Sequence, residues 1–270
     1  MFSHIMQYLK KIYHYRELLF QLTYRDVTAR YKGSYLGITW ALLNPLVMLG
    51  IYSFIFITIF DLRWGLDNNN NKTLYTLMIF SGLVPFYIFS ESINRSITVL
   101  SSNANYVKKV VFPLELLPIS TVFSIVINNM FGLFLLIVGK LIFLDTANWT
   151  MIYIPLILIP LVLLSMGLSL ALSALGVYIR DLVHAVGLIV NILFYMSPIF
   201  YDSSIVPEPF NSFINLNPLT SIITQIRNVI LLGQPLDLNS YIITFVGSIL
   251  VFITGIGIFK YFRRGFSDVL

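Results

Sequence analysis

The sequence has 270 residues, of which 57% are hydrophobic and only 11% are charged, and its formal net charge is +5. Soluble domains carry about 25% charged residues, so this composition excludes an ordinary soluble protein and predicts a polytopic membrane protein with one membrane domain. Cysteine is absent, which excludes disulfides, thiolate metal sites and a catalytic thiol. The three histidines are too scattered along the sequence to predict a metal site.

Residues 1–35 are expected to form a basic arm. Charged residues occupy its other faces, while the apolar residues recur at helical spacing: Tyr15, Leu18, Leu19 and Leu22. This pattern favours an amphipathic helix lying on a membrane surface. The alternative is a solvent-exposed helix packed on a partner protein. Gly33 and Gly37 are expected to turn the chain toward the first membrane span.

Six apolar runs follow, each close to the roughly 20 residues that an α-helix needs to cross the hydrocarbon core of a bilayer. We therefore expect an all-α fold with a transmembrane domain over residues 36–262 and a cytoplasmic tail over residues 263–270. The expected spans are residues 36–60, 74–94, 116–143, 151–178, 183–201 and 241–259.

The distribution of Lys and Arg predicts the orientation of these spans. Six lie in the arm, three between the second and third spans, one at Arg180 and three from Lys260 onward, so 13 of the 17 fall on one side. Cytoplasmic loops carry the excess of Lys and Arg. Both termini are therefore expected in the cytoplasm.

The longest polar interruption between apolar runs covers residues 94–113. It contains Arg95, Lys108 and Lys109 but no acidic residue. Such a segment cannot remain in lipid, because its backbone and cations need water or protein partners. It either forms a short helix that contacts a partner or is a solvated connector whose cations obey the positive-inside rule.

Residues 202–240 are unusually apolar for an external loop. Asn217 can cap a helix that begins at Pro218, and Gly233 can end it. The resulting 15 residues would span about 22 Å, which is shorter than the membrane core, and Gln225 and Arg227 exclude a lipid-facing crossing. We expect a re-entrant helix that gates the external side; the alternative is a helix lying on the outer surface.

Polar residues also form stripes within three expected spans. These stripes predict a shared polar path, unless each of them only binds neighbouring helices. The candidate pore-lining residues are Trp40, Asn44, Tyr87, Glu91, Asn191 and Tyr195. Small or polar residues on the third and fourth spans instead predict close helix packing: Ser124, Asn128, Gly132, Ser165, Ser169, Ser173 and Gly176.

No enzymatic motif accompanies these features. Gly139 and Lys140 lack the earlier glycine of a phosphate-binding loop, and the signatures of proteases and metal hydrolases are missing. The chain is therefore not expected to be an enzyme or to hold a cofactor, with a membrane-embedded enzyme as a distant alternative.

The order of these motifs resembles the permease subunits of type-2 ABC exporters. The resemblance extends over nearly the whole chain, and it is greatest to the branch that exports lipid-linked polysaccharide, with O-antigen first and teichoic acid and capsule next. The motifs that carry it are YKGSYLG at residues 31–37, Trp40, LNP at 43–45, SSNAN at 101–105, VKKVVFP at 107–113 and NPLT at 217–220.

This resemblance implies a homodimeric permease in the bacterial cytoplasmic (inner) membrane, with two separate ATP-binding subunits that hold ATP and Mg. It also implies that the loop between the second and third spans supplies a coupling helix to those subunits. The residues concerned are Ser101, Ser102, Asn103, Ala104, Asn105, Tyr106, Lys108 and Lys109. The expected substrate is lipid-linked polysaccharide, and membrane lipid but no nucleic acid is expected as a further partner. A drug or small-lipid exporter of the same fold and a stand-alone secondary carrier are the alternatives.

Overall fold

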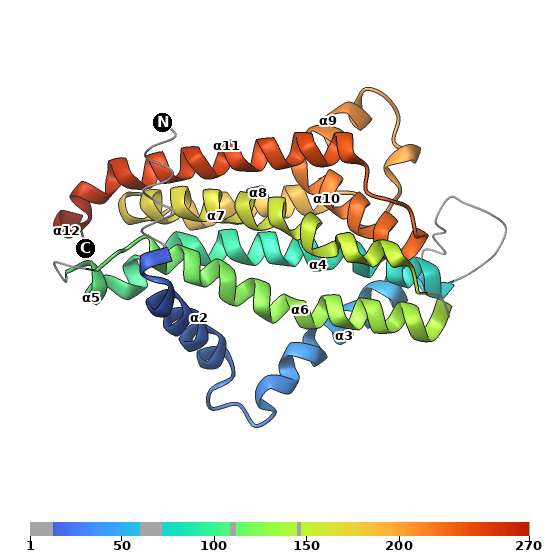
Figure 1. Ribbon diagram of the computed structural model, residues 1–270, viewed down its shortest axis with the longest axis horizontal. Coiled ribbons are helices and arrows are strands. Elements are labelled where there is room, and N and C mark those ends of the chain that lie inside the picture. The colour runs from blue at the N-terminus through green and yellow to red at the C-terminus, as the bar shows by residue number, and fades with distance from the viewer. Residues whose placement is uncertain (1–12, 60–71, 109–111, 145–146, 270) are drawn as a thin grey trace.

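The computed structural model describes residues 13–59, 72–108, 112–144 and 147–269, and these residues form helices and connecting turns without any strand (Figure 1). The α-helices are α2 (Arg16–Tyr31), α3 (Trp40–Ser53), α4 (Lys72–Thr98), α5 (Ala104–Val107), α6 (Leu116–Leu144), α7 (Ile154–Tyr178), α8 (Leu182–Met196), α9 (Phe210–Leu216), α10 (Pro218–Arg227), α11 (Leu238–Phe262) and α12 (Phe266–Val269). Shorter 3-10 or π turns cover Gly37–Thr39, Phe54–Ile59, Ser101–Asn103, Trp149–Tyr153, Ser203–Ile205, Asn228–Leu232 and Arg263–Gly265. The expectation of an all-α membrane protein is confirmed.

Four helices of the described chain are long and apolar enough to cross a bilayer: α4, α6, α7 with its preceding turn, and α11. The first expected span is divided among the Gly37–Thr39 turn, α3 and the Phe54–Ile59 turn, which follow one another without a break. The fifth expected span is shorter than predicted, because α8 ends at Met196 rather than near residue 201. Ser197 is extended there, as a residue before proline prefers to be, and Pro198 cannot continue the helix.

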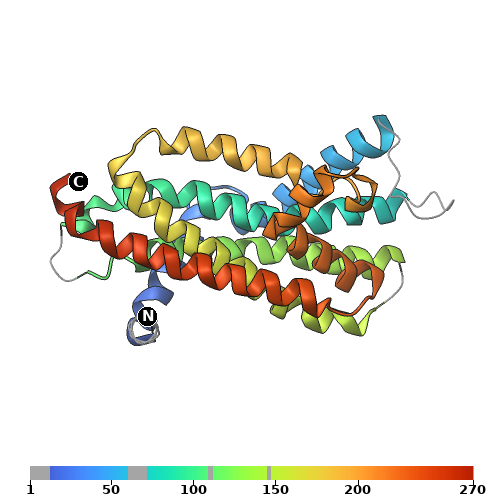
Figure 2. The same cartoon turned by 90° about the horizontal axis from the view of Figure 1, so that it is seen from above.

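Helix α4 is the centre of the bundle and is buried along most of its length. It packs against α6 on one side and α7 on the other, while α8 and α10 also contact it (Figure 2). The apolar side chains that it buries belong to the larger of the two hydrophobic cores found in the described part of the chain. Helix α4 therefore connects the end of the bundle at α10 to the loop that precedes α6.

Helices α7 and α11 make the most extensive helix–helix contact among the described residues. A Cβ atom added at Gly255 would lie 2.0 Å from the carbonyl oxygen of Gly167, so the two backbones touch at this point. Ser165, Ser169 and Ser173 of α7 are fully buried. The prediction that the small residues of the fourth span serve close packing is confirmed.

The arm helix α2 runs obliquely across α6 (Figure 1). The face that the sequence predicted to lie on a membrane instead packs against the bundle, through the side chains of Tyr15, Leu18, Leu19 and Leu22. Phe20 and Tyr24 occupy another face, where they stack on each other and are 71% and 63% exposed. The pattern of apolar spacing therefore located the buried side of this helix.

Candidate functional site

Four of the six candidate pore-lining residues border one cavity of about 480 Å³. Trp40 and Asn44 reach it from α3, and Tyr87 and Glu91 reach it from α4. Helix α6 provides a third wall with Asn128, Asn129 and Gly132, and Arg30 of α2 provides a fourth. The structure thus brings together residues of two predicted stripes, whose one-turn spacing places their side chains on one face of each helix.

Sequence reasoning missed Arg30 and Asn129 and assigned Asn128 only to packing. Gly132 does pack as predicted, since a Cβ atom there would lie 3.2 Å from the side chain of Val84. Arg30 belongs to the arm and could be placed at the cavity only once α2 was seen to fold back along α6. The adjacent amides of Asn128 and Asn129 within an apolar run were the available signal.

An ion pair and a hydrogen bond tie the arm to the two helices beside the cavity. The guanidinium of Arg30 contacts the carboxylate of Glu91, which also lies 3.5 Å from Arg95 on the next turn of α4. The hydroxyl of Tyr31 donates a hydrogen bond to the amide oxygen of Asn128. Both ends of these contacts are partly buried, so the end of α2 is held against α4 and α6.

Asn191 and Tyr195 do not join this cavity within one chain. Helix α8 packs through Val186 and Val190, which are buried. The side chains at 191 and 195 lie on other faces of the helix, and Tyr195 is 70% exposed. The six candidate residues therefore form two groups in a single chain.

The predicted coupling loop contains a short helix. Ser101–Asn103 form a 3-10 turn that leads into α5, and the side chains of Ser102 and Asn103 bond back to carbonyl oxygens at the end of α4. Ser101, Ser102, Asn105 and Lys108 are exposed, whereas Asn103, Ala104 and Tyr106 are half-buried. Lys109 lies outside the described residues.

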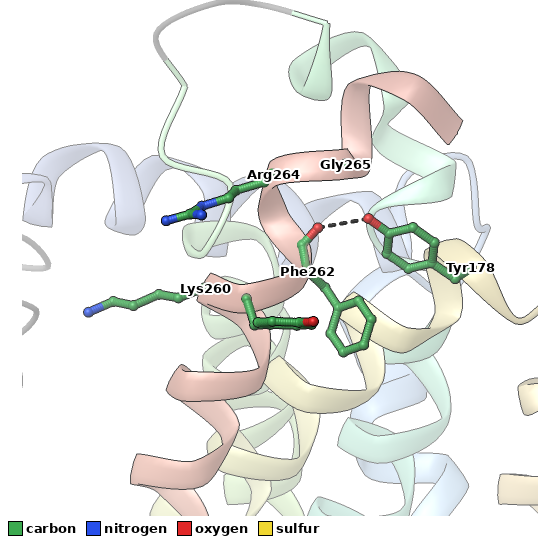
Figure 3. Close-up of a pocket in the computed structure, with 6 residues that line it drawn as sticks. Tyr178, Lys260, Phe262, Arg264 and Gly265 are labelled. Carbon is green, nitrogen blue, oxygen red and sulfur yellow. Dashed lines mark hydrogen bonds between the residues drawn. The ribbon is translucent and has the colours of Figure 1, made fainter.

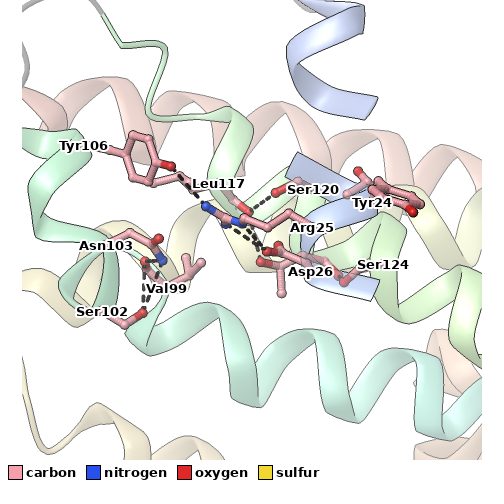
Figure 4. A network of polar contacts seen from close by, with 12 residues as sticks. Tyr24, Arg25, Asp26, Val99, Ser102, Asn103, Tyr106, Leu117, Ser120 and Ser124 are labelled. Carbon is pink, nitrogen blue, oxygen red and sulfur yellow. Dashed lines mark hydrogen bonds and ion pairs between the residues drawn. The ribbon is translucent and has the colours of Figure 1, made fainter. Parts of the chain in front are cut away.

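The coupling loop is connected directly to the arm (Figure 4). Arg25 of α2 donates a hydrogen bond of 3.2 Å to the hydroxyl of Tyr106 and pairs with its neighbour Asp26 at 2.8 Å. Burial lowers the pKa of Arg25, but the Asp26 carboxylate and the Tyr106 hydroxyl outweigh that effect and raise it. Helix α2 therefore contacts the coupling loop at Arg25 and the cavity at Arg30, five residues further on.

The expected external gate is a buried helix. The side chain of Asn217 accepts a hydrogen bond from the backbone of Leu219, Pro218 begins α10, and Gly233 ends the following π turn with a positive φ of 66°. Gln225 and Arg227 are only 5% and 4% exposed, so the alternative of a helix lying on the outer surface is wrong. Arg227 donates to the carbonyl oxygens of Pro198 and Met78 at 2.9 and 3.2 Å, which connects α10 to α4 and to the chain beyond α8.

The far end of this helix, the Asn228–Leu232 turn that follows α10, is held by residues that the sequence did not indicate. Lys140 of α6 is fully buried and donates to the carbonyl oxygen of Ile230. Thr150 donates to the carbonyl oxygen of Val229 at 2.6 Å. With its amide oxygen facing them, Asn148 accepts from the backbone of Gly233 at 2.9 Å and from Lys140 at 2.5 Å. These groups satisfy carbonyls that a helix end leaves without backbone partners.

A second hollow of about 570 Å³ lies beside the C-terminal tail (Figure 3). Tyr178 donates a hydrogen bond of 2.8 Å to the carbonyl oxygen of Phe262, and Lys260 and Arg264 extend on the same side of the tail. The neighbouring Arg263 instead pairs with the buried Glu115 at the start of α6, at 3.1 Å. The tail is thereby fixed to α6 and α7 beside the coupling loop.

Comparison with known proteins found one matching family model and several similar proteins. A family model described as ABC-2 type transporter matches residues 17–231. The O-antigen export system permease protein RfbA of Klebsiella pneumoniae is 32% identical over 255 residues, which cover 94% of this chain and 95% of that protein. The protein of the same name from Myxococcus xanthus is 29% identical over 83% of this chain and 84% of its own length. The polysialic acid transport protein KpsM of Escherichia coli is 23% identical over 77% and 79%.

Proposed function

Because the chain belongs to the ABC-2 type transporter family, we propose that it is the membrane subunit of an ATP-driven exporter of lipid-linked polysaccharide, with O-antigen as the glycan. The observation that carries this proposal is the similarity to O-antigen export permeases over 94% of the chain. Similarity to the polysialic acid transporter is lower and covers less of the chain, so capsule export is the second candidate.

ATP hydrolysis belongs to a separate pair of ATP-binding subunits, which hold ATP and Mg. The absence of a phosphate-binding loop from the sequence supports this division of labour. The exposed side chains around α5 form the contact with those subunits: Ser101, Ser102, Asn105 and Lys108. Since Tyr106 of the same loop is bonded to Arg25, motion of the loop is passed to the arm.

Two copies of the chain form the conduit, with both termini in the cytoplasm of a bacterial cell and the chain in its inner membrane. The charge distribution supports this orientation. The exposed polar groups of α8 support the dimer, because Asn191 and Tyr195 would be costly to place against lipid. A two-fold axis between copies would instead turn them toward the second copy.

The test is reconstitution of the chain with its ATP-binding partner in proteoliposomes. We expect lipid-linked O-antigen to raise ATP turnover and to become accessible on the opposite side of the membrane. An undecaprenyl carrier without glycan is the control for the lipid, and a lipid-linked capsular polymer is the control for the glycan. Stimulation by the bare carrier would refute a polysaccharide exporter, and stimulation by the capsular polymer alone would favour the second candidate.

A further inference from the structure

The cavity between α2, α3, α4 and α6 contains polar groups that the protein itself does not use. The amide of Asn44 is exposed to the cavity and makes no side-chain hydrogen bond within the described part of the chain. The indole of Trp40, which is 41% exposed, likewise has no hydrogen-bond partner among those residues. Placing a polar group in an apolar environment without a hydrogen-bond partner costs roughly 2–7 kcal/mol. We therefore expect these groups to bind water or a polar ligand.

The charges around the cavity exclude an anion as the preferred occupant. Among the described residues that line it, Arg30 is the only cation, and its guanidinium is already paired with Glu91. Arg95, which lies nearby, is within 3.5 Å of the same carboxylate. A phosphate in the cavity would have to compete with Glu91 for Arg30, whereas a neutral ligand leaves the pair intact.

The amides and aromatic rings in the lining favour a sugar over a hydrocarbon chain, and its apolar side chains can pack on the C–H face of the sugar: Ala41, Pro45, Met48, Phe80 and Val84. A sugar ring has hydroxyls that both donate and accept, and a C–H face that lies flat on an aromatic ring. The cavity offers the amide of Asn44 and the amide oxygen of Asn129, whose nitrogen donates to the carbonyl oxygen of Ile125 at 3.0 Å, for the hydroxyls. It offers the rings of Trp40 and Tyr87 for the flat face. A prenyl chain would leave the amides unpaired. The volume of about 480 Å³ lies within the range of roughly 300–1,000 Å³ that holds small organic ligands.

We propose that this cavity binds one neutral sugar unit of the transported glycan, so that each protomer has its own sugar site separate from the faces that α8 presents to a second copy. The proposal rests on the proposed function, since it names where that glycan is held. Its position next to Arg30 and Tyr31 links the site to the arm, which Arg25 connects to the coupling loop.

Trp40 provides a direct probe of this site. The sequence has three tryptophans, Trp40, Trp64 and Trp149, so W64F and W149F together leave one at the cavity. The single-tryptophan permease is assembled with its ATP-binding partner in nanodiscs. Its emission is followed during titration with saccharide released from lipid-linked O-antigen, with inorganic pyrophosphate, and with farnesol.

We expect a saturable change with the saccharide and none with the other two probes. Asn44→Leu and Asn129→Leu should each weaken the apparent affinity by about 3- to 10-fold, as loss of one hydrogen bond does. The matched control is Asn239→Leu at the exposed start of α11, which should leave the titration unchanged. Unaltered Trp40 emission without ligand, together with a single peak in gel filtration, establishes that both cavity variants are folded.

A response to pyrophosphate alone would identify an anion site, and a response to farnesol alone would identify a site for the lipid carrier; either overturns the proposal. Lack of any response to saccharide overturns it as well. ATP turnover stimulated by lipid-linked O-antigen is measured in the same preparation. If that stimulation persists without a Trp40 response, the sugar site is wrong and the exporter function stands; if stimulation is absent, the proposed function itself fails.

Discussion

Gly255→Ala tests whether the bundle depends on direct backbone contact between α7 and α11. The added Cβ atom would lie 2.0 Å from the carbonyl oxygen of Gly167, whereas ordinary van der Waals contact begins at 3.4 Å. The helices must therefore separate by up to about 1.4 Å, the difference between these two distances. Since the obstructing atoms belong to the backbone, no side-chain rotation can relieve the clash.

The free energy of unfolding follows from two opposing effects. Overpacking costs about 1–3 kcal/mol, and a backbone obstacle favours the upper end. Replacing glycine by alanine within a helix contributes about 1 kcal/mol in the opposite direction. We therefore expect Gly255→Ala to lower the free energy of unfolding by about 2 kcal/mol.

Gly257→Ala is the matched control, because it lies on the same helix and a Cβ atom there meets nothing within 4 Å. It should leave stability unchanged or raise it by up to about 1 kcal/mol. The measurement is reversible unfolding in mixed micelles at increasing SDS, followed by far-UV circular dichroism. Equal effects of the two substitutions, or wild-type stability of Gly255→Ala, would refute the close-contact argument.

Three further predictions address orientation, coupling and the external gate. A cysteine at Asn105 should be protected from an impermeant thiol reagent added to intact cells, and one at Asn215 should be labelled. The sequence has no other cysteine that could react. Labelling at Asn105 would show that the orientation is the reverse of the one proposed. Tyr106→Phe removes the hydroxyl that binds Arg25 but keeps the ring, so we expect less glycan exported per ATP hydrolysed at unchanged membrane abundance. Tyr24→Phe, on the exposed face of α2, is the control and should leave this ratio of glycan to ATP unchanged. The same ratio in both variants would show that the arm does not transmit the motion. Lys140→Met leaves the Ile230 carbonyl without this donor and removes one of the two donors to Asn148, so it should lower the free energy of unfolding by about 1–3 kcal/mol. The control is the SDS titration of Leu141→Met, an exposed neighbour, and equal stability of the two variants would show that Lys140 does not hold this end of the helix.

The sequence predicted the helices and their ends well where capping residues and backbone geometry determine them. Asn217, Pro218 and Gly233 fix the ends of the gate helix through capping and backbone geometry that depend on adjacent residues alone. The one-turn spacing of Trp40 with Asn44 and of Tyr87 with Glu91 was sufficient to place each pair on one face, and the structure brings the two pairs to one cavity.

The remaining features depend on tertiary contacts that no local pattern contains. Arg30 reaches Glu91 only because α2 packs back along α6, and 61 residues separate the two in sequence. Lys140 was visible only as an isolated cation in an apolar run, with its backbone acceptor at Ile230 90 residues away. The structure also shows that proline at Ala104 would occupy the first position of α5, where a helix tolerates it, so Ala104→Pro would be a weak test of the coupling helix.

Helices α3 and α8 bury few side chains against the rest of the bundle, and this affects how a path through the membrane opens. Helix α3 fully buries only Ala41, and α8 buries only Val186 and Val190. Moving either helix against α4 thus breaks few side-chain contacts, and such contacts, rather than the hydrophobic effect, hold helices together in lipid. The interlocked backbones of α7 and α11 form a stiff frame by comparison. We expect the two outer helices, which carry Trp40, Asn44, Asn191 and Tyr195, to swing while that frame stays still, so that the width of the passage adjusts to successive sugars without unpacking the core.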